Sequence, residues 1–204
     1  MCRLDTSEPM AALTFDDGPH PEFTGKLLET LLRHRARATF FMIGEHAQAQ
    51  PETVRKVAEA GHAVANHSWS HPHFTETPGR SRRAQIRGCQ GAIAPFGQKL
   101  FRPPFGSANV WTHLEAVLLG YRVIMWDIDP KDWSGRSAGA IAQDVITNIR
   151  PGSIVLLHDG AYKDAEYTDR QPTVDAVDQI LAALAGKYRF GTIPELLGRD
   201  KDRR

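Results

Sequence analysis

Two adjacent aspartates, Asp16 and Asp17, follow an apolar segment and precede the turn residues Gly18 and Pro19. Because Gly and Pro break a strand, neighbouring carboxylates can turn toward one cavity instead of pointing to opposite faces. Two carboxylates side by side repel each other, so we expect cations close to them. A divalent metal ion beside one carboxylate and Arg102 beside the other would supply two cations.

His67 and His71 lie four residues apart, a spacing that brings two imidazoles together on a helical turn or a compact loop. Either histidine alone is typical of a structural role, whereas the pair, in a stretch that also contains His62 and His73, indicates a metal site. Together with Asp17 it offers two nitrogens and one carboxylate oxygen, leaving coordination positions for water and substrate. The same donor set also suits an iron oxygenase, which stays open at this point.

The elements that must position these residues are predicted from hydrophobic patterning. Apolar segments rich in β-branched or aromatic residues predict buried strands at 10–15, 38–43, 62–65, 121–126 and 153–157. Short strands near Phe101 and at 188–192 bring the number to about seven. Segments with helical spacing alternate with these strands, for example the one that contains Leu114, Val117 and Leu118.

Three glycines, Gly61, Gly120 and Gly186, each follow a helical pattern and precede a strand, as a C-terminal cap does. The alternation of strands and helices with short turns predicts an α/β fold with a parallel sheet covered by helices, either open or closed into a barrel. The count of about seven strands favours an incomplete or distorted (β/α) barrel. No linker or repeat divides the chain, so we expect a single catalytic domain over residues 1–204, with its core at about 10–197.

Polar residues directly follow the predicted strands. They are Asp16 and Asp17, His67 and His71, Arg102, the segment 127–133, and His158 and Asp159. In a parallel α/β barrel all of these emerge at one rim, where loops converge while the strands hold them rigidly. The coincidence of five such clusters predicts an active site at that rim.

At this point the motifs resemble a known family. The segments TFDDGP (14–19), HSWSH (67–71), RPPF (102–105), DPKDW (129–133) and LLH (156–158) are similar to the five ordered motifs of the NodB-homology polysaccharide deacetylases, which are carbohydrate esterases. The resemblance covers roughly residues 10–197. It implies a NodB-type distorted barrel and a hydrolase that removes acetyl groups.

The resemblance also implies a role for each metal-site and proton-transfer residue. Asp17, His67 and His71 would bind one divalent cation, usually Zn²⁺ in such enzymes, with Co²⁺ or Ni²⁺ as substitutes. Such an ion lowers the pKa of a bound water toward roughly 7 and polarises a carbonyl. Asp16 would be the general base, and Arg102 would orient its carboxylate.

The remaining implied roles belong to the acid and to the acetyl pocket. His158 would protonate the departing nitrogen, with Asp132 as its partner and Asp129 as the second candidate for that position. Phe105, Trp133 and Leu156 would line the acetyl pocket, and the backbone N–H of Phe105 would help to hold the oxyanion.

The function predicted is hydrolysis of an N-acetyl amide on an N-acetylglucosamine glycan, either a chitin oligosaccharide or a peptidoglycan-like polymer. The same machinery would also cleave O-acetyl esters, for example on acetylated xylan. A non-catalytic glycan-binding module is a third possibility, although intact metal ligands together with Asp16 and His158 argue against it.

Composition limits the partners. Lys and Arg total 25 against 24 for Asp and Glu, which argues against nucleic acid as a partner. No stretch approaches the roughly 18–20 apolar residues of a membrane span, so we expect no membrane partner, and no motif indicates an oligomeric state.

Without a visible signal peptide the chain is expected in the cytoplasm, or outside the cell if an export signal has been removed. The arginine cluster Arg80, Arg82, Arg83 and Arg87 fits a solvated helix face better than a grip on an anionic polymer.

Overall fold

The computed structural model describes the backbone of residues 1–201 and the side chains of residues 1–198. It contains a sheet of seven strands, all paired in parallel, in the order β5-β4-β3-β2-β1-β6 with β7 beside β1. The strands are β1 (Met10–Asp16), β2 (Ala38–Met42), β3 (Ala63–Asn66), β4 (Gly97–Phe101), β5 (Arg122–Val123), β6 (Ile154–His158) and β7 (Arg189–Phe190).

The sheet curls into a half-barrel, which confirms the distorted α/β barrel expected from the sequence. Its two ends, β5 and β6, are joined by the irregular segment that follows β5. In that segment the backbone N–H of Ile124 donates to Phe101, and that of Asp127 donates to Ile154. The strand predicted at 121–126 is therefore only two residues long, because its later residues leave β4 and cross toward β6.

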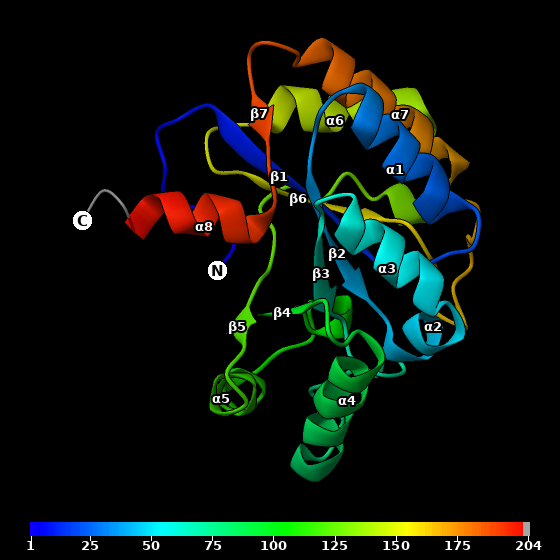
Figure 1. Cartoon of the computed structure of the whole chain (residues 1–204), viewed down its shortest axis with the longest axis vertical. Helices are drawn as coiled ribbons and strands as arrows, with labels where there is room; N and C mark the ends of the chain where they lie inside the picture. Colours follow the sequence, from blue (N-terminus) through cyan, green and yellow to red (C-terminus); the bar gives the residue numbers. More distant parts are fainter. Residues whose placement is uncertain (202–204) are drawn as a thin grey trace.

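Eight α-helices occur among the described residues: α1 (Phe23–Arg33), α2 (Gly44–Ala49), α3 (Pro51–Glu59), α4 (Gly79–Ala92), α5 (Val110–Leu118), α6 (Ala138–Asn148), α7 (Gln171–Ala183) and α8 (Ile193–Lys201). Two 3-10 turns, η1 (Pro104–Gly106) and η2 (Asp132–Ser134), lie at the rim. Figure 1 shows α1, α6 and α7 together at one end of the molecule and α4 and α5 at the other.

The central strands are buried on both faces, as their continuous apolar sequences predict. Phe15 and Phe40 stack with ring centroids 5.0 Å apart inside the larger core cluster. The predicted caps Gly61, Gly120 and Gly186 all have positive φ, between 73° and 82°, the conformation in which a glycine ends a helix at the lowest cost.

Helix α5 departs from the pattern expected of a helix that covers a sheet. Its helically spaced residues Leu114, Val117 and Leu118 are exposed, and it buries Thr112 and Glu115 instead. The buried Glu115 is paired with Arg82 of α4 at 2.7 Å, so Arg82 is also buried and does not belong to a solvated face. The helically spaced apolar residues of α5 therefore lie on the face of the helix that points to solvent.

Within the described residues, no helix is both long enough and apolar enough to cross a membrane.

Candidate active site

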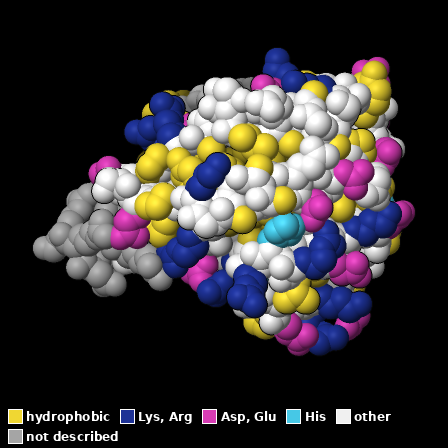
Figure 2. Space-filling model, turned by 90° about the horizontal axis from the view of Figure 1, so that it is seen from above, with side chains coloured by type: hydrophobic (Ala, Val, Ile, Leu, Met, Phe, Trp, Pro, Cys, Tyr) yellow, Lys and Arg dark blue, Asp and Glu magenta, His cyan; other side chains and the backbone are white. Residues whose placement is uncertain are grey.

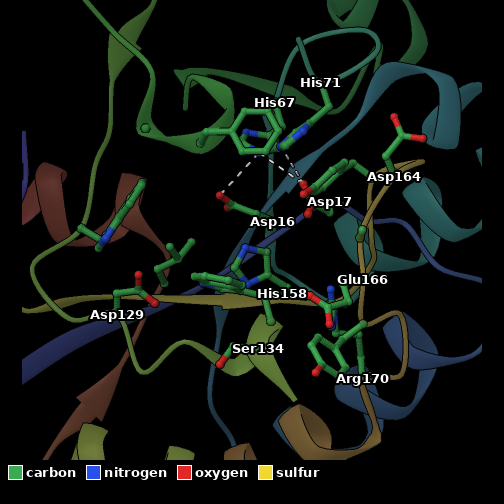
Figure 3. A pocket seen from close by; sticks show the side chains of 18 residues that line it. Asp16, Asp17, His67, His71, Asp129, Ser134, His158, Asp164, Glu166 and Arg170 are labelled. Atoms are coloured by element: carbon green, nitrogen blue, oxygen red, sulfur yellow. Dashed lines mark ion pairs between the residues drawn. The ribbon is translucent and has the colours of Figure 1, made fainter. Parts of the chain in front are cut away.

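The polar residues that follow the strands converge at the carboxyl ends of β1, β3, β4 and β6. Strand β1 ends at Asp16, which lies opposite His158 of β6 in the pairing register. His67 comes directly after β3, and Arg102 directly after β4. Figure 3 shows His67 and His71 on one side of the two aspartates and His158 on the other. The rim predicted from the sequence therefore carries one connected site.

Asp17 is the point at which the two histidines meet. Its Oδ1 atom lies 3.4 Å from Nε2 of His67 and 3.2 Å from Nε2 of His71. The ligand atoms of these three buried residues all lie within 4.8 Å of one another. Two atoms bound to one ion at ~2.1 Å each are at most about 4.2 Å apart, so the two measured distances suit a shared cation.

The hydrogen bonding of these residues also fits a cation. His67 donates from Nδ1 to the carbonyl oxygen of Arg102 at 2.8 Å, which leaves the lone pair of Nε2 facing Asp17. Burial lowers the pKa of His71 to about 3, so this imidazole is neutral. Asp17 Oδ1 is buried without a hydrogen-bond partner among the described residues. A cation would stabilise this buried carboxylate oxygen and the two imidazole nitrogens beside it.

Burial alone would raise the pKa of Asp17, but contact with His67 and the charges of His71 and His158 lower it far below its usual value. The carboxylate is therefore ionised at neutral pH. Asp17 itself has φ of 70°, in the left-handed region that few non-glycine residues occupy. With this turn the Asp17 carboxylate lines the same cavity as that of Asp16, as the sequence predicted.

Asp16 is held by a different partner. Arg102 is fully buried and donates from Nη1 to Asp16 Oδ1 at 2.7 Å and to Thr14 Oγ1 at 2.8 Å. The same guanidinium lies over the ring of Phe41, 4.2 Å from its centroid. Asp16 Oδ2 is 3.6 Å from His67 Nε2, on the side where the metal ligands gather. One oxygen of Asp16 is thus fixed, and the other is directed toward the site.

Gly18 is required because another carboxylate lies against it. A Cβ atom at Gly18 would be 2.2 Å from Oδ2 of Asp159, an impossible contact. Asp159 Oδ2 accepts a hydrogen bond from Thr24 at 2.6 Å, and burial raises the pKa of Asp159 to about 7. Asp159 therefore supports the turn after β1 from behind and does not face the cavity.

His158 and Asp132 form a hydrogen-bonded pair. His158 Nδ1 lies 2.8 Å from Asp132 Oδ1, and Asp132 Oδ2 accepts hydrogen bonds from the His158 backbone and from Thr173, each at 2.8 Å. Burial alone would lower the pKa of His158, but the charge and hydrogen bond of Asp132, with Asp17 and Asp16, raise it to about 9. Asp129 accepts from the backbone of Lys131 instead, so Asp132 is the partner of His158.

A cavity of about 520 Å³ opens over these groups. It contains all three residues expected around the acetyl group: Leu156 is buried in its wall, whereas Phe105 and Trp133 are partly exposed. Phe105 has φ of 56° and stacks on His73, with ring centroids 3.9 Å apart. The cavity brings together every residue that the sequence motifs indicated except Arg102 and Asp132, which lie behind Asp16 and His158.

The sequence motifs missed one wall of the cavity. It is formed by the segment 160–170 between β6 and α7, which contributes Tyr162, Asp164, Ala165, Glu166, Tyr167 and Arg170. Tyr162 stacks on His71 with ring centroids 4.7 Å apart. The position of this segment directly after a strand of the same rim, and its aromatic and charged composition, are the signals that could have indicated it.

Comparison with known proteins shows the family to which the chain belongs. The sequence profile of the family described as polysaccharide deacetylase matches residues 3–124. The chain belongs to this family. It is 36% identical to the chitooligosaccharide deacetylase of Sinorhizobium fredii over 192 residues, which are 89% of this chain and 88% of that protein.

Solved structures of the family share the fold. The Bc1960 peptidoglycan N-acetylglucosamine deacetylase superposes with a TM-score of 0.88 and 34% identity, over 96% of this chain and 91% of that chain. BA3943 from Bacillus anthracis, a CE4 family pseudoenzyme, superposes with a TM-score of 0.86 and 28% identity, over 97% of this chain and 68% of that chain. Because a pseudoenzyme shares the fold, catalysis has to be judged from the side chains in the cavity.

Proposed function

We propose that this polysaccharide deacetylase family member is a metal-dependent hydrolase that removes the acetyl group from N-acetylglucosamine units of a glycan. The observation that carries the proposal is the arrangement around one cavity of three groups: an Asp–His–His cluster, an arginine-held carboxylate and a carboxylate-held histidine. Each group supplies one requirement of amide hydrolysis, and no part of the set is missing.

Asp17, His67 and His71 would hold a divalent cation. The fit rests on the unpartnered Oδ1 of Asp17 and on the two imidazole nitrogens directed at it. When bound there, such an ion would polarise the acetyl carbonyl and favour ionisation of a water molecule. One carboxylate with two imidazoles suits Zn²⁺, and Co²⁺ or Ni²⁺ are expected to substitute.

Asp16 acts as the base in this proposal. Its Oδ1 is occupied by Arg102, which leaves Oδ2 to accept a proton from the attacking water. Water oxygen then bonds to the acetyl carbon, and the carbonyl electron pair moves onto its oxygen. The buried Arg102 fixes the orientation of the Asp16 carboxylate, so Oδ2 stays directed toward the site.

His158 acts as the acid. Its Nδ1 is engaged by Asp132, which leaves Nε2–H to donate a proton to the sugar nitrogen as the carbon–nitrogen bond breaks. The products are acetate and a free amine on the sugar. A pKa of about 9 keeps His158 protonated at neutral pH, as a general acid must be.

The substrate assignment rests on the relatives and on the cavity. Relatives that match nearly the whole chain are named for chitooligosaccharide or for peptidoglycan N-acetylglucosamine. The cavity wall carries aromatic side chains, Phe105, Trp133, Tyr162 and Tyr167, whose faces can pack against sugar rings. We infer a chitin oligosaccharide or a peptidoglycan glycan as substrate, with O-acetyl esters such as acetylated xylan as the second candidate.

The test measures acetate release and product mass after incubating the zinc-loaded chain with N-acetylglucosamine oligomers, peptidoglycan fragments and acetylated xylan. We expect Asp16→Asn to lose activity severely while its zinc content stays near that of the parent, because Asn keeps the shape but accepts no proton. If Asp16→Asn loses zinc while Asp17→Asn keeps both zinc and activity, the two aspartates have been assigned the wrong way round. If acetate is released from acetylated xylan alone, the substrate is an O-acetyl ester and the proposed N-acetyl amide is wrong.

A further inference from the structure

Helix α5 is amphipathic, but its apolar face points to solvent and its more polar face points to the protein. The side chains that face the protein are Thr112, Glu115 and Ala116, and the exposed ones include Val110, Trp111, Leu114, Val117 and Leu118. Trp111 is 61% exposed, and Leu118 is 74% exposed. The exposed residues recur at the spacing of one helix face, so they form a continuous apolar stripe, which we call the α5 stripe. A stripe of this kind at the surface marks a site of interaction.

The part of the chain around the α5 stripe is strongly basic. From residue 77 to residue 126 the only carboxylate is Glu115, against seven Lys and Arg residues. Glu115 is neutralised by Arg82 and Arg83, each at 2.7 Å. Of the other basic residues, Arg102 belongs to the active site, whereas Arg80, Arg87, Lys99 and Arg122 are exposed.

Elements that contact α5 carry several of these charges. The Cβ position of Gly79, which begins α4, would lie 2.5 Å from the Glu115 carboxylate, so the first turn of the basic helix α4 packs against the inward face of α5. Lys99 lies 4.7 Å from the ring centroid of Tyr121, three residues after α5 ends, and Arg122 follows in β5. The opposite end of the molecule differs: over α1, α6 and α7, Lys and Arg are mixed with Asp and Glu (Figure 2).

We propose that the α5 stripe docks onto a membrane surface that contains anionic lipid headgroups. A helix that lies in the plane of such a surface inserts its apolar residues among the acyl chains, while flanking Lys and Arg attract the headgroups. Trp is favoured at this depth because its ring is apolar and its N–H is polar. The expectation of no membrane partner rested on the lack of a membrane-spanning stretch. This mode needs no such stretch, because the helix lies on the membrane and does not cross it.

A second copy of the chain is a poorer partner for the α5 stripe. A two-fold pair would bring α5 against α5, and the basic residues of α4, β4 and β5 against their own counterparts, so like charges would face each other. An anionic surface offers the opposite charge. Helix α5 also lies at one extremity of the molecule beside α4, where a flat surface can reach it (Figure 1).

The experiment sediments the 204-residue chain with vesicles of phosphatidylcholine mixed with phosphatidylglycerol, and with vesicles of phosphatidylcholine alone. We expect binding to the anionic vesicles that weakens at high salt. Leu118→Gln should bind roughly ten-fold more weakly, because it loses most of one buried leucine. Arg122→Gln should bind about five-fold more weakly, since a basic residue near the surface contributes about 1 kcal/mol.

Matched controls are available on the far side. Leu32 of α1 is 78% exposed and lies away from α5, so Leu32→Gln should bind like the parent. Lys187→Gln is the matched control for Arg122→Gln. Circular dichroism establishes that each variant is folded, independently of any activity.

Equal binding by Leu118→Gln and Leu32→Gln, or no binding to anionic vesicles, would overturn the proposal. So would a parent dimer in solution that Leu118→Gln converts to monomer, because α5 would then face another copy.

Discussion

Asp16 and Asp17 are neighbours in the chain but have different surroundings, and much of the chemistry of the site depends on that difference. Asp16 is paired with the buried Arg102, whereas Asp17 faces two imidazole nitrogens. The sequence predicted a cation for each carboxylate, because two adjacent charges at one rim need compensation. It could not show that Asp17 adopts a positive φ, which is a property of the folded turn.

At the level of single residues, the metal ligands can be tested by metal content. We expect His67→Ala and His71→Ala each to lower zinc affinity by more than roughly 100-fold, since loss of even an outer hydrogen-bond partner costs 10- to 100-fold. Zinc is measured by elemental analysis after dialysis against a zinc buffer. His113→Ala, which removes an exposed histidine of α5, is the control and should keep full zinc. Full zinc in the His67→Ala, His71→Ala double variant would show that the ion binds elsewhere.

The pairing of His158 with Asp132 predicts a specific pH dependence. Asp132 helps to raise the pKa of His158 to about 9, so the parent should keep its acid protonated well above neutral pH. In Asp132→Asn, burial is no longer offset by this charge, and the alkaline limb of the rate profile on an N-acetylated oligosaccharide should move to lower pH. Rates are measured across pH at equal zinc occupancy. If the alkaline limb is unchanged in Asp132→Asn, the assignment of His158 as the general acid is wrong.

The same pair predicts how stability changes with pH. The pKa of His158 is higher in the folded chain than its unfolded value near 6.5, so the pair contributes fully below that pH and its contribution is lost as pH rises through about 9. Asp132→Asn should therefore lower the free energy of unfolding more at pH near 6 than at pH near 10. Denaturant titrations at the two pH values measure the difference.

At the level of elements, the strands that end in polar residues were predicted most accurately from the sequence. The strands β1, β3 and β6, and the residues after them, lie where hydrophobic runs and turn residues placed them. The strand at 121–126 was too long, because hydrophobicity does not reveal where a backbone changes its hydrogen-bond partner. Helix α5 shows a related limit: periodicity indicates an apolar face but not whether that face meets the sheet or the solvent.

The segment 160–170, which the motifs missed, depends on one arginine. Arg170 is 1% exposed and donates from Nε to the carbonyl oxygen of Gly160 at 2.7 Å, which ties the two ends of the segment together. We expect Arg170→Met to loosen it and to raise the KM for an oligosaccharide, while zinc content stays the same. Limited trypsin digestion should cut after the exposed Lys163 roughly ten-fold faster, because cleavage tracks local opening.

Arg33→Met removes a guanidinium from the surface pair with Asp178 and is the control for this loosening. It should change neither the digestion rate nor KM. If Arg170→Met is cut no faster than the parent, the segment is held by its other contacts and Arg170 has no such positioning role.

At the level of the whole molecule, the site is assembled from strand ends that are far apart in the sequence. Its proposed ligands follow β1 and β3, its arginine follows β4, and its acid ends β6. Parallel strands with buried faces position these ends, and the core clusters between them consist of apolar residues. Sequence motifs could therefore indicate the site, because each motif marks the end of an element whose place in the sheet is fixed by packing. The single-domain organisation stays a prediction.

If packing of the apolar core forms the fold and the metal binds afterwards, the effect of the metal on stability can be predicted. We expect the metal-free chain to unfold cooperatively, and added zinc to raise Tm, because the ion binds the native state and relieves the repulsion around Asp16 and Asp17. Zinc at about 100 times its Kd contributes about 2.7 kcal/mol. With roughly 2–4 °C per kcal/mol for a chain of this size, Tm should rise by about 5–11 °C.

Calorimetry with chelator and then with zinc measures the shift, and His67→Ala should show almost none of it. An equal rise in His67→Ala would place the stabilising ion outside the Asp17, His67 and His71 cluster. A metal-free chain without a cooperative transition would mean that the strand ends need the ion in order to come together. The repulsion between the carboxylates would then outweigh the packing that is expected to hold them in place.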